Sequence, residues 1–285
     1  PQLACLRVGD APLLQYAAAN GAPPSTAQLL LTTSPPTVAL GQPESLDLSQ
    51  LGVTVGPQHR LWELASLRHL DLSGSTLELP VPLERLPLLT ELDLRRTGLT
   101  EVPASVCGLA SLQGLSLAGN ALGALPAELA QLVQLTALDL SSTGLAKLPL
   151  SICEMPSLQD LNIGSNALGN LPAELAQLTE LTTLDLSHVG LTEVPPVICG
   201  MASLRSLKLS GNPLPSLPLA FLQLSQLAEL HLDGEAGLAN VASILGESGV
   251  QGVFRYLTDL YDDPTPSFSL KLVLVRPCFL LRSVI

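Results

Sequence analysis

Leucines recur at a nearly constant interval over most of this chain. The unit that begins at Leu112 reads LxxLxLxxNxL, and the unit that begins at Leu135 repeats this frame with threonine in place of asparagine. Counted at the central leucine, the steps between units are 24, 22 and then six times 23 residues. The central leucines are residues 46, 70, 92, 115, 138, 161, 184, 207 and 230. These nine copies exceed the roughly three that a repeat array needs for stability.

The spacing dictates how such units must pack. In each Leu-x-Leu segment, alternation along an extended strand places both leucines on one side. One unit cannot bury its leucines alone, so the units must stack in parallel around a continuous apolar interior. Because hydrophobic residues are 47% of the chain and aromatic residues only 3%, leucine, valine and alanine have to fill that interior. The sequence predicts an α/β solenoid with a concave parallel sheet and capped ends.

Asparagine occupies the position after the strand in alternate units. Asn120, Asn166 and Asn212 are expected to bond backbone groups where the strand ends. The intervening units carry other residues at this position, so the asparagine ladder is only half complete: Ser75, Thr97, Thr143 and Val189.

This alternation belongs to a longer period of 46 residues. Residues 92–137, 138–183 and 184–229 are variants of one double unit. Either a ligand has the same period, or duplication of a pair of units happened to preserve the fold. We favour duplication, because the stability of a solenoid depends on contacts between nearest neighbours.

Residues 40–235 strongly resemble the leucine-rich-repeat family, in its 23-residue class with the motif LxxLxxLxLxxNxLxxLPxxLxxL. The resemblance implies a horseshoe whose concave face is a parallel sheet. It also implies a function in protein recognition, because members of the family use this surface to bind other proteins.

The segments at either side do not follow the repeat. Residues 1–39 are interpreted as an N-terminal cap, with a short helix through residues 17–19 and a strand at residues 29–31. Residues 236–263 are expected to form a helical C-terminal cap. The apolar residues at helical spacing are Val250, Val253, Phe254, Leu257, Leu260 and Tyr261.

Residues 264–285 are interpreted as a linker followed by a strand. The order of repeats, helix and strand resembles the junction with the GTPase domain in Roco proteins, where the strand has the form KLxLVG, and residues 271–275 fit it. A phosphate loop of the form GxxxxGK[ST] should follow, but residues 276–282 contain no glycine. The resemblance therefore implies a GTPase domain that is absent or degenerate, and we expect no GTP binding. A tail with one extra strand is the alternative.

Composition restricts the classes of partner and the cellular compartment that we expect for this chain. A net charge of −12 argues against nucleic acid or anionic lipid as the main partner. The chain has no signal-peptide pattern at its start and no apolar run of about eighteen residues. Five scattered cysteines and the lack of an Asn-x-Ser/Thr acceptor favour a reducing compartment, so we expect a cytoplasmic protein.

The residues that carry catalysis elsewhere do not form a recognisable pattern here. The four histidines lie in separate units, no His/Cys pair has zinc spacing, and no serine sits in a nucleophile elbow. We therefore expect no enzymatic activity, no cofactor and no metal.

Alternation along each strand also predicts the outward-facing side chains of the concave face. With Asp47, this face carries nine acids against two basic residues and no Trp, Tyr or Phe, the types of which interface hot spots are rich. Binding is therefore expected to be electrostatic and directed at a basic protein surface. The candidate partner-binding residues are Asp71, Glu91, Asp93, Arg95, Asp139, Asp160, Asn162, Asp185, Lys208, Glu229, His231 and Asp233.

Several functions are compatible with this pattern. A hard cation could bind where Asp71 and Asp93 face each other, although solvated carboxylates are the favoured interpretation. For the whole chain, the first hypothesis is a non-catalytic interaction scaffold in intracellular signalling. The second is the repeat region of a Roco-type GTPase. An extracellular pattern receptor is disfavoured by the absence of cysteine-rich caps.

Three cysteines lie one double unit apart, at Cys107, Cys153 and Cys199. Two strand spacings separate neighbours in this set by about 9.5 Å or more, whereas a disulfide needs Cα atoms within about 7 Å. We expect free thiols that pack in small apolar slots.

Overall fold

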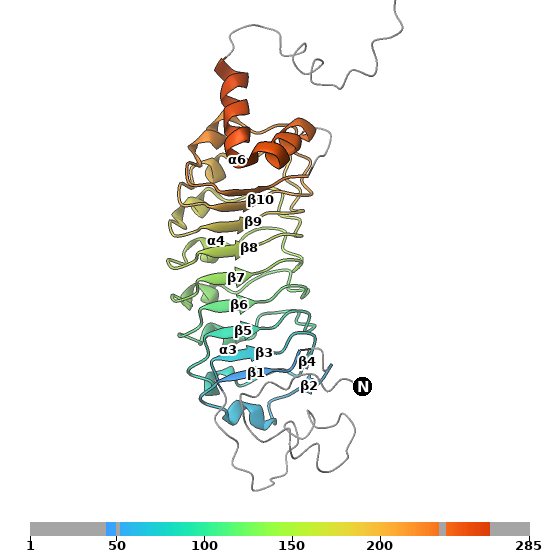
Figure 1. Cartoon of the computed structure of the whole chain (residues 1–285). Helices are drawn as coiled ribbons and strands as arrows, with labels where there is room; N and C mark the ends of the chain where they lie inside the picture. Colours follow the sequence, from blue (N-terminus) through green and yellow to red (C-terminus); the bar gives the residue numbers. More distant parts are fainter. Residues whose placement is uncertain (1–43, 50–51, 234–237, 263–285) are drawn as a thin grey trace, which may run out of the picture.

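The computed structural model describes residues 44–49, 52–233 and 238–262. It is a stack of flat turns, each contributing one short strand to a continuous sheet (Figure 1). The expected N-terminal cap, with its helix and strand, and the expected strand at residues 271–275 lie outside the described residues.

Nine strands of three residues form one parallel sheet. Its order follows the chain, and each central leucine pairs with the central leucine of the next unit, for example Leu115 with Leu138. The predicted register and solenoid fold are therefore confirmed. The strands are β1 (Ser45–Asp47), β3 (His69–Asp71), β5 (Glu91–Asp93), β6 (Gly114–Ser116), β7 (Ala137–Asp139), β8 (Asp160–Asn162), β9 (Thr183–Asp185), β10 (Ser206–Lys208) and β11 (Glu229–His231).

A second, two-stranded parallel sheet joins the first two units, β2 (Thr54–Val55) with β4 (Thr76–Leu77). This junction has no asparagine link: Ser75 is 2% exposed and its hydroxyl has no hydrogen-bond partner. The extra backbone pairing between β2 and β4 therefore connects two units that the side-chain ladder leaves unconnected.

The arcs that return the chain alternate between two forms from residue 100 onward. One form is a single α-helical turn and the other a 3-10 helix, and each follows a proline, which needs no partner for its nitrogen. The α-helical arcs are α3 (Ala104–Cys107), α4 (Leu150–Cys153) and α5 (Pro196–Cys199). The 3-10 arcs are η3 (Ala127–Gln131), η4 (Ala173–Gln177) and η5 (Leu219–Gln223), and the earlier units have η1 (Arg60–Glu63) and η2 (Leu83–Arg85).

The interior is a ladder of leucines, as the composition required. From β1 to β10 the two inward-facing apolar residues of each strand segment are almost completely buried, as in Leu92 and Leu94, which are 2% and 0% exposed. Trp62 is buried towards the N-terminal end of the described core, and its Nε1 donates a hydrogen bond to the carbonyl oxygen of Gly56 at 2.9 Å.

The buried asparagines confirm the expected bonds to backbone groups, and they also link two units. Nδ2 of Asn120 donates to the carbonyl oxygens of Leu117 (2.8 Å) and of Leu94 in the preceding unit (2.7 Å). Its Oδ1 accepts from the N–H groups of Thr97 (3.0 Å) and Leu99 (3.1 Å), both also in that preceding unit.

The same bonds join Asn166 to the unit of Thr143 and Asn212 to the unit of Val189. Each asparagine thus satisfies backbone groups of its own unit and of its neighbour, which has no asparagine. The 46-residue period therefore has a structural basis that nearest-neighbour stacking alone did not suggest: two kinds of arc alternate, and one asparagine joins each pair.

The last unit is closed by α6 (Ala239–Asp262), which appears in red at the top of Figure 1. Gly249 interrupts this helix with φ of 63°, so the chain forms two helical segments rather than the single short helix expected. Val253 and Leu257 are buried, and the ring of Phe254 makes an edge contact with Phe221 at 6.2 Å between centroids.

We expect Asn166→Ala to lower the free energy of unfolding by about 3 kcal/mol or more, because it leaves buried N–H and carbonyl groups of two units without partners. Urea unfolding followed by circular dichroism measures this. Thr143→Val is the matched comparison. It removes a buried hydroxyl that donates to the carbonyl oxygen of Leu140 and to Oδ1 of Asn166, and it should cost only about 1 kcal/mol, since Val189 occupies the same position in the next double unit. Equal effects of the two substitutions would show that the asparagine does not link the units.

Candidate functional site

The concave face presents three columns of side chains that run across the strands. The first column precedes the central leucine and includes Glu91 and Gly114, the middle column follows it, and the third column lies two residues further. The middle column is mostly acidic and half-buried from β1 to β9. Its members are Asp47, Asp71, Asp93, Ser116, Asp139, Asn162 and Asp185, followed by Lys208 and His231.

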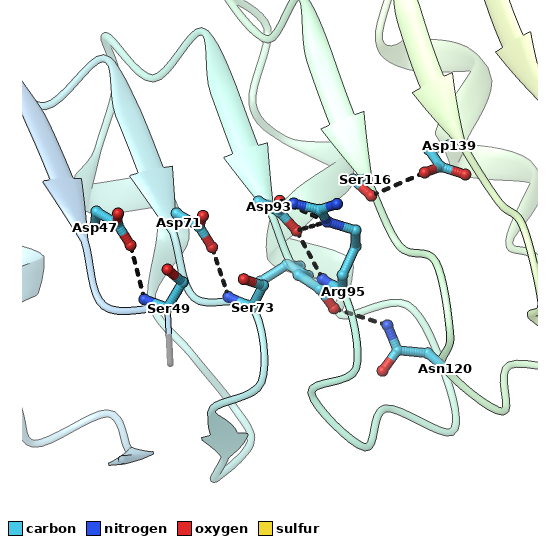
Figure 2. A network of polar contacts seen from close by, with 10 residues as sticks. Asp47, Ser49, Asp71, Ser73, Asp93, Arg95, Ser116, Asn120 and Asp139 are labelled. Atoms are coloured by element: carbon cyan, nitrogen blue, oxygen red, sulfur yellow. Dashed lines mark hydrogen bonds and ion pairs between the residues drawn. The ribbon is translucent and has the colours of Figure 1, made fainter. Parts of the chain in front are cut away.

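Each middle-column aspartate is the last residue of its strand, and its side chain accepts a hydrogen bond from the backbone two residues later. Oδ1 of Asp71 accepts a hydrogen bond from the N–H of Ser73 at 2.8 Å, and Asp47 accepts one from Ser49 at the same distance (Figure 2). Asp93, Asp139 and Asp185 make the equivalent bond at 2.9, 3.0 and 2.9 Å. One carboxylate oxygen of each is therefore committed to the backbone, and they are not the freely solvated carboxylates that sequence reasoning favoured.

On β8 the middle column has Asn162 in place of an aspartate, and this asparagine makes the same hydrogen bond. Oδ1 of Asn162 accepts from the N–H of Gly164 at 3.0 Å. The strand-ending bond thus needs an amide or carboxylate oxygen but no charge, and the charges of the aspartates remain available for another purpose.

Both basic residues of the face are already paired with acids of the face. Arg95 binds the carboxylate of Asp93, and this hydrogen bond raises the pKa of Arg95 further (Figure 2). Nζ of Lys208 lies 3.2 Å from Oδ2 of Asp185. Burial by itself would raise the pKa of Asp185, but hydrogen bonds from Ser187 and the pairing with Lys208 lower it overall.

The first and middle columns line a shallow groove of about 570 Å³ that extends from β1 to β10. At β6 the groove is lined by Gly114, which has no side chain, and by Ser116. The carboxylate of Glu91 leans across this point, because a Cβ atom at Gly114 would collide with it.

The structure brings eight of the twelve predicted site residues into this groove. They are Asp71, Glu91, Asp93, Asp139, Asp160, Asn162, Asp185 and Lys208. The groove is also lined by Ser45, Asp47, His69 and Thr183. Alternation placed these four residues on the concave face, but they were not among the candidate partner-binding residues.

The other four predicted residues lie elsewhere. Arg95 borders a separate hollow beside the groove, together with Arg96 and Ser141. Glu229, His231 and Asp233 lie at the last strand or just after it, where Asp233 accepts a hydrogen bond from the N–H of Gly211. The single acidic surface predicted from alternation is therefore a groove with a neighbouring, more basic hollow.

In the described part of the chain, no three His, Cys, Asp or Glu side chains come together in a way that could hold a metal ion. No helix among these residues has the length and apolar character needed to cross a bilayer.

The three cysteines of the α-helical arcs are buried and free, as predicted. Burial raises the pKa of each thiol, and that of Cys153 reaches about 11, with a smaller contribution from the charge of Glu174. Buried, protonated thiols are poor nucleophiles, so the arcs offer packing rather than redox chemistry.

The known proteins that this chain resembles share one fold. The sequence profile of the family described as Leucine rich repeat matches residues 87–145 and 179–236. A leucine-rich-repeat protein of Leptospira interrogans is 36% identical with a TM-score of 0.57, over 61% of this chain and 44% of that one. The search of curated proteins gave no match.

Two plant receptors are also similar. The peptide hormone receptor RGFR1, solved in complex with RGF2, is 28% identical with a TM-score of 0.54, over 66% of this chain and 32% of that one. The Arabidopsis receptor kinase HAESA, solved with the peptide hormone IDA and the co-receptor SERK1, is 25% identical with a TM-score of 0.59, over 79% and 39%. The match spans less than half the length of each of these solved chains. Residues 87–145 and 179–236 of this chain thus match the leucine-rich-repeat family, and the repeat fold predicted from the sequence is confirmed.

We expect Asp71→Asn to leave stability nearly unchanged, because its amide oxygen can still accept from Ser73, as Asn162 does from Gly164. Asp71→Ala should cost about 1 kcal/mol, since it removes a partly buried hydrogen bond. Urea unfolding of the three proteins compares them. If the asparagine variant is as unstable as the alanine variant, the carboxylate charge itself holds the strand end.

We expect the buried thiols to resist alkylation at pH 8 in the native protein and to react fully in denaturant, as measured by mass spectrometry of the peptides containing Cys107, Cys153 and Cys199. The pKa of Cys153 is higher in the folded than in the unfolded chain, from 9.0 to about 11. Its stabilising contribution is therefore present below pH 9 and is lost as the pH rises from 9 towards 11. Immediate native labelling of all three would contradict the packing role.

Proposed function

We propose that this domain is a protein-interaction module that takes a basic segment of its partner into the concave groove. Its charge balance carries the proposal. The face has nine acids, namely Asp47, Asp71, Glu91, Asp93, Asp139, Asp160, Asp185, Glu229 and Asp233. Its two cations, Arg95 and Lys208, are both neutralised by acids of the same face, so several carboxylates have no positive partner.

Such a surface should select by charge. It offers no Trp, Tyr or Phe as an anchor, and hot spots of binding energy concentrate on aromatic and arginine side chains. The partner would have to supply those anchors, and arginine fits an acidic groove because its guanidinium can bind a carboxylate at two points. Association should weaken as salt screens the charges.

The similar proteins support the kind of ligand. The receptor RGFR1 was solved in complex with RGF2, and HAESA with the peptide hormone IDA and a co-receptor. Peptide and protein ligands therefore occur on this fold, which favours a macromolecular partner over a small substrate for this chain. The domain would act as a non-catalytic scaffold.

The wider role is proposed from sequence. The odd number of cysteines and the lack of a glycosylation acceptor support a scaffold in cytoplasmic signalling. The second candidate, a repeat region of a Roco-type GTPase, is favoured by the strand-like run at residues 271–275.

For either role we predict no binding of GTP, which titration calorimetry with a non-hydrolysable analogue and Mg²⁺ tests. Saturable micromolar binding would overturn this prediction.

We predict that the chain binds an arginine-rich peptide, and that affinity falls steeply between low and high salt in titration calorimetry. Four substitutions that remove charge but keep polar shape should weaken binding about tenfold or more, given the small energy of each exposed ion pair. They are Asp71→Asn, Glu91→Gln, Asp139→Asn and Asp160→Asn.

The matched control removes four exposed charges on the arc side, at Glu128, Glu154, Glu174 and Glu193. Changing these to glutamine alters the net charge equally but should leave the peptide affinity within about twofold, because the groove is unchanged. An equal loss in both variants would mean that the peptide responds only to overall charge, and the concave groove would not be the site.

A further inference from the structure

The turn between β2 and η1 contains a histidine whose ring takes part in the backbone hydrogen bonding. Nδ1 of His59 accepts a hydrogen bond from the N–H of Gly56 at 2.9 Å. The N–H of His59 in turn donates to the carbonyl oxygen of Gly56 at 3.3 Å. These two bonds close the turn of residues 56–59, so its shape depends on an imidazole nitrogen that is free to accept.

The same glycine fixes the one tryptophan of the chain. Nε1 of Trp62 donates to the carbonyl oxygen of Gly56 at 2.9 Å, and Trp62 is 1% exposed. Gly56 is itself buried, and the side chains of Gln58 and Glu78 lie so close to it that an added Cβ atom would collide with both. Because water has little access to this buried N–H group, losing the bond to His59 would leave it without a partner.

The turn lies next to the backbone pairing that joins the first two units. It follows β2, which pairs with β4, and the N–H of Glu78 extends this pairing by donating to the carbonyl oxygen of Val55 at 2.8 Å. No asparagine links these two units, because Ser75 occupies that position and its hydroxyl has no hydrogen-bond partner. An opened turn would therefore weaken the junction at the point where it relies on the backbone.

Protonation of His59 removes the acceptor on which the turn depends. When Nδ1 of the neutral ring accepts, the one ring proton lies on Nε2, whereas the imidazolium ion has N–H groups at both nitrogens. The N–H of Gly56 would then face a second N–H group. The closed turn is therefore compatible with the neutral ring and not with the charged one.

The surroundings of His59 favour the neutral ring. Burial lowers its pKa, and the charge of Glu78, directly after β4, opposes this with a smaller effect; among the described residues it is the charged group that acts on this ring. The amide nitrogen of Gln58 lies between the two, 3.4 Å from Nε2 of His59 and 3.4 Å from a carboxylate oxygen of Glu78. Because the folded-state pKa is below the ordinary value of about 6.5, the stabilising contribution of neutral His59 is present above that pH and is lost as the pH falls below it.

We propose that the turn of residues 56–59 is a pH-sensitive latch at the N-terminal end of the described solenoid. With His59 neutral, the turn is closed and holds Trp62 in the core. With His59 protonated, the turn opens and the first unit is held less tightly to the second. This inference is independent of what the concave groove binds.

The fluorescence of Trp62 tests the latch in the full chain, because this is the one tryptophan of the sequence. As the pH is lowered from 8 to 5, the emission should shift to longer wavelength and acrylamide should quench it more strongly, with a midpoint below about pH 6.5. Unchanged emission and quenching over this range would overturn the proposal.

Three variants separate His59 from other titrating groups. His59→Asn keeps a side-chain acceptor that does not titrate, so its emission should stay at the value of the unchanged chain at pH 8. His59→Ala removes the acceptor and should give, already at pH 8, the emission of the unchanged chain at pH 5. His188→Asn removes an exposed histidine of a later unit and should retain the full pH response. An equal response of the His59→Asn variant and the unchanged chain would show that another group titrates, and the latch would be wrong.

Discussion

Backbone pairing between successive turns of the solenoid is the constraint on which the other features depend. A parallel ladder holds neighbouring strands about 4.8 Å apart, and the central leucines can be buried only if each turn repeats in register with the last. The register is regular from β1 to β11. It aligns the leucines on the inner side, and on the outer side it aligns whichever residues alternate with them. The acidic groove is thus a consequence of the same pairing that builds the core, because the middle-column residues of successive strands, aspartate in five of the nine, become a column.

The asparagine links explain how the solenoid tolerates units that have threonine or valine instead of asparagine. Asn120, Asn166 and Asn212 each bond backbone groups in two successive units, which relieves the neighbouring unit of the need for its own asparagine. Thr97, Thr143 and Val189 can therefore differ, and their units form α-helical rather than 3-10 arcs. A duplication that copied a linked pair would keep each asparagine with the unit it completes, which is consistent with a period of 46 rather than 23 residues.

Much of the fold could be predicted from the sequence, because the signal repeats nine times and each copy restricts the others. The strands, their order, the leucine interior and the buried cysteines all follow from the spacing. The role of the aspartates could not be predicted, since alternation shows only which way Asp71 points and not that its Oδ1 accepts from the N–H of Ser73. Similarly, alternation along the strand correctly predicts that Arg95 faces the concave side. Because it lies two residues after Asp93, however, it borders the hollow beside the groove rather than the groove itself. The helical segment before Gly249 could not be predicted in the same way, because the apolar residues identified at helical spacing begin only at Val250.

We propose that a partner binds in the concave groove and not on the arcs. The decisive measurement is a crystal structure of the chain with an arginine-rich peptide. We expect the peptide to lie in the groove, with guanidinium groups against carboxylates that have no ion pair, such as Asp71, Glu91, Asp139 and Asp160. A peptide bound as well ordered on the arcs, or in the hollow beside Arg95 and Arg96, with the groove empty, would contradict it.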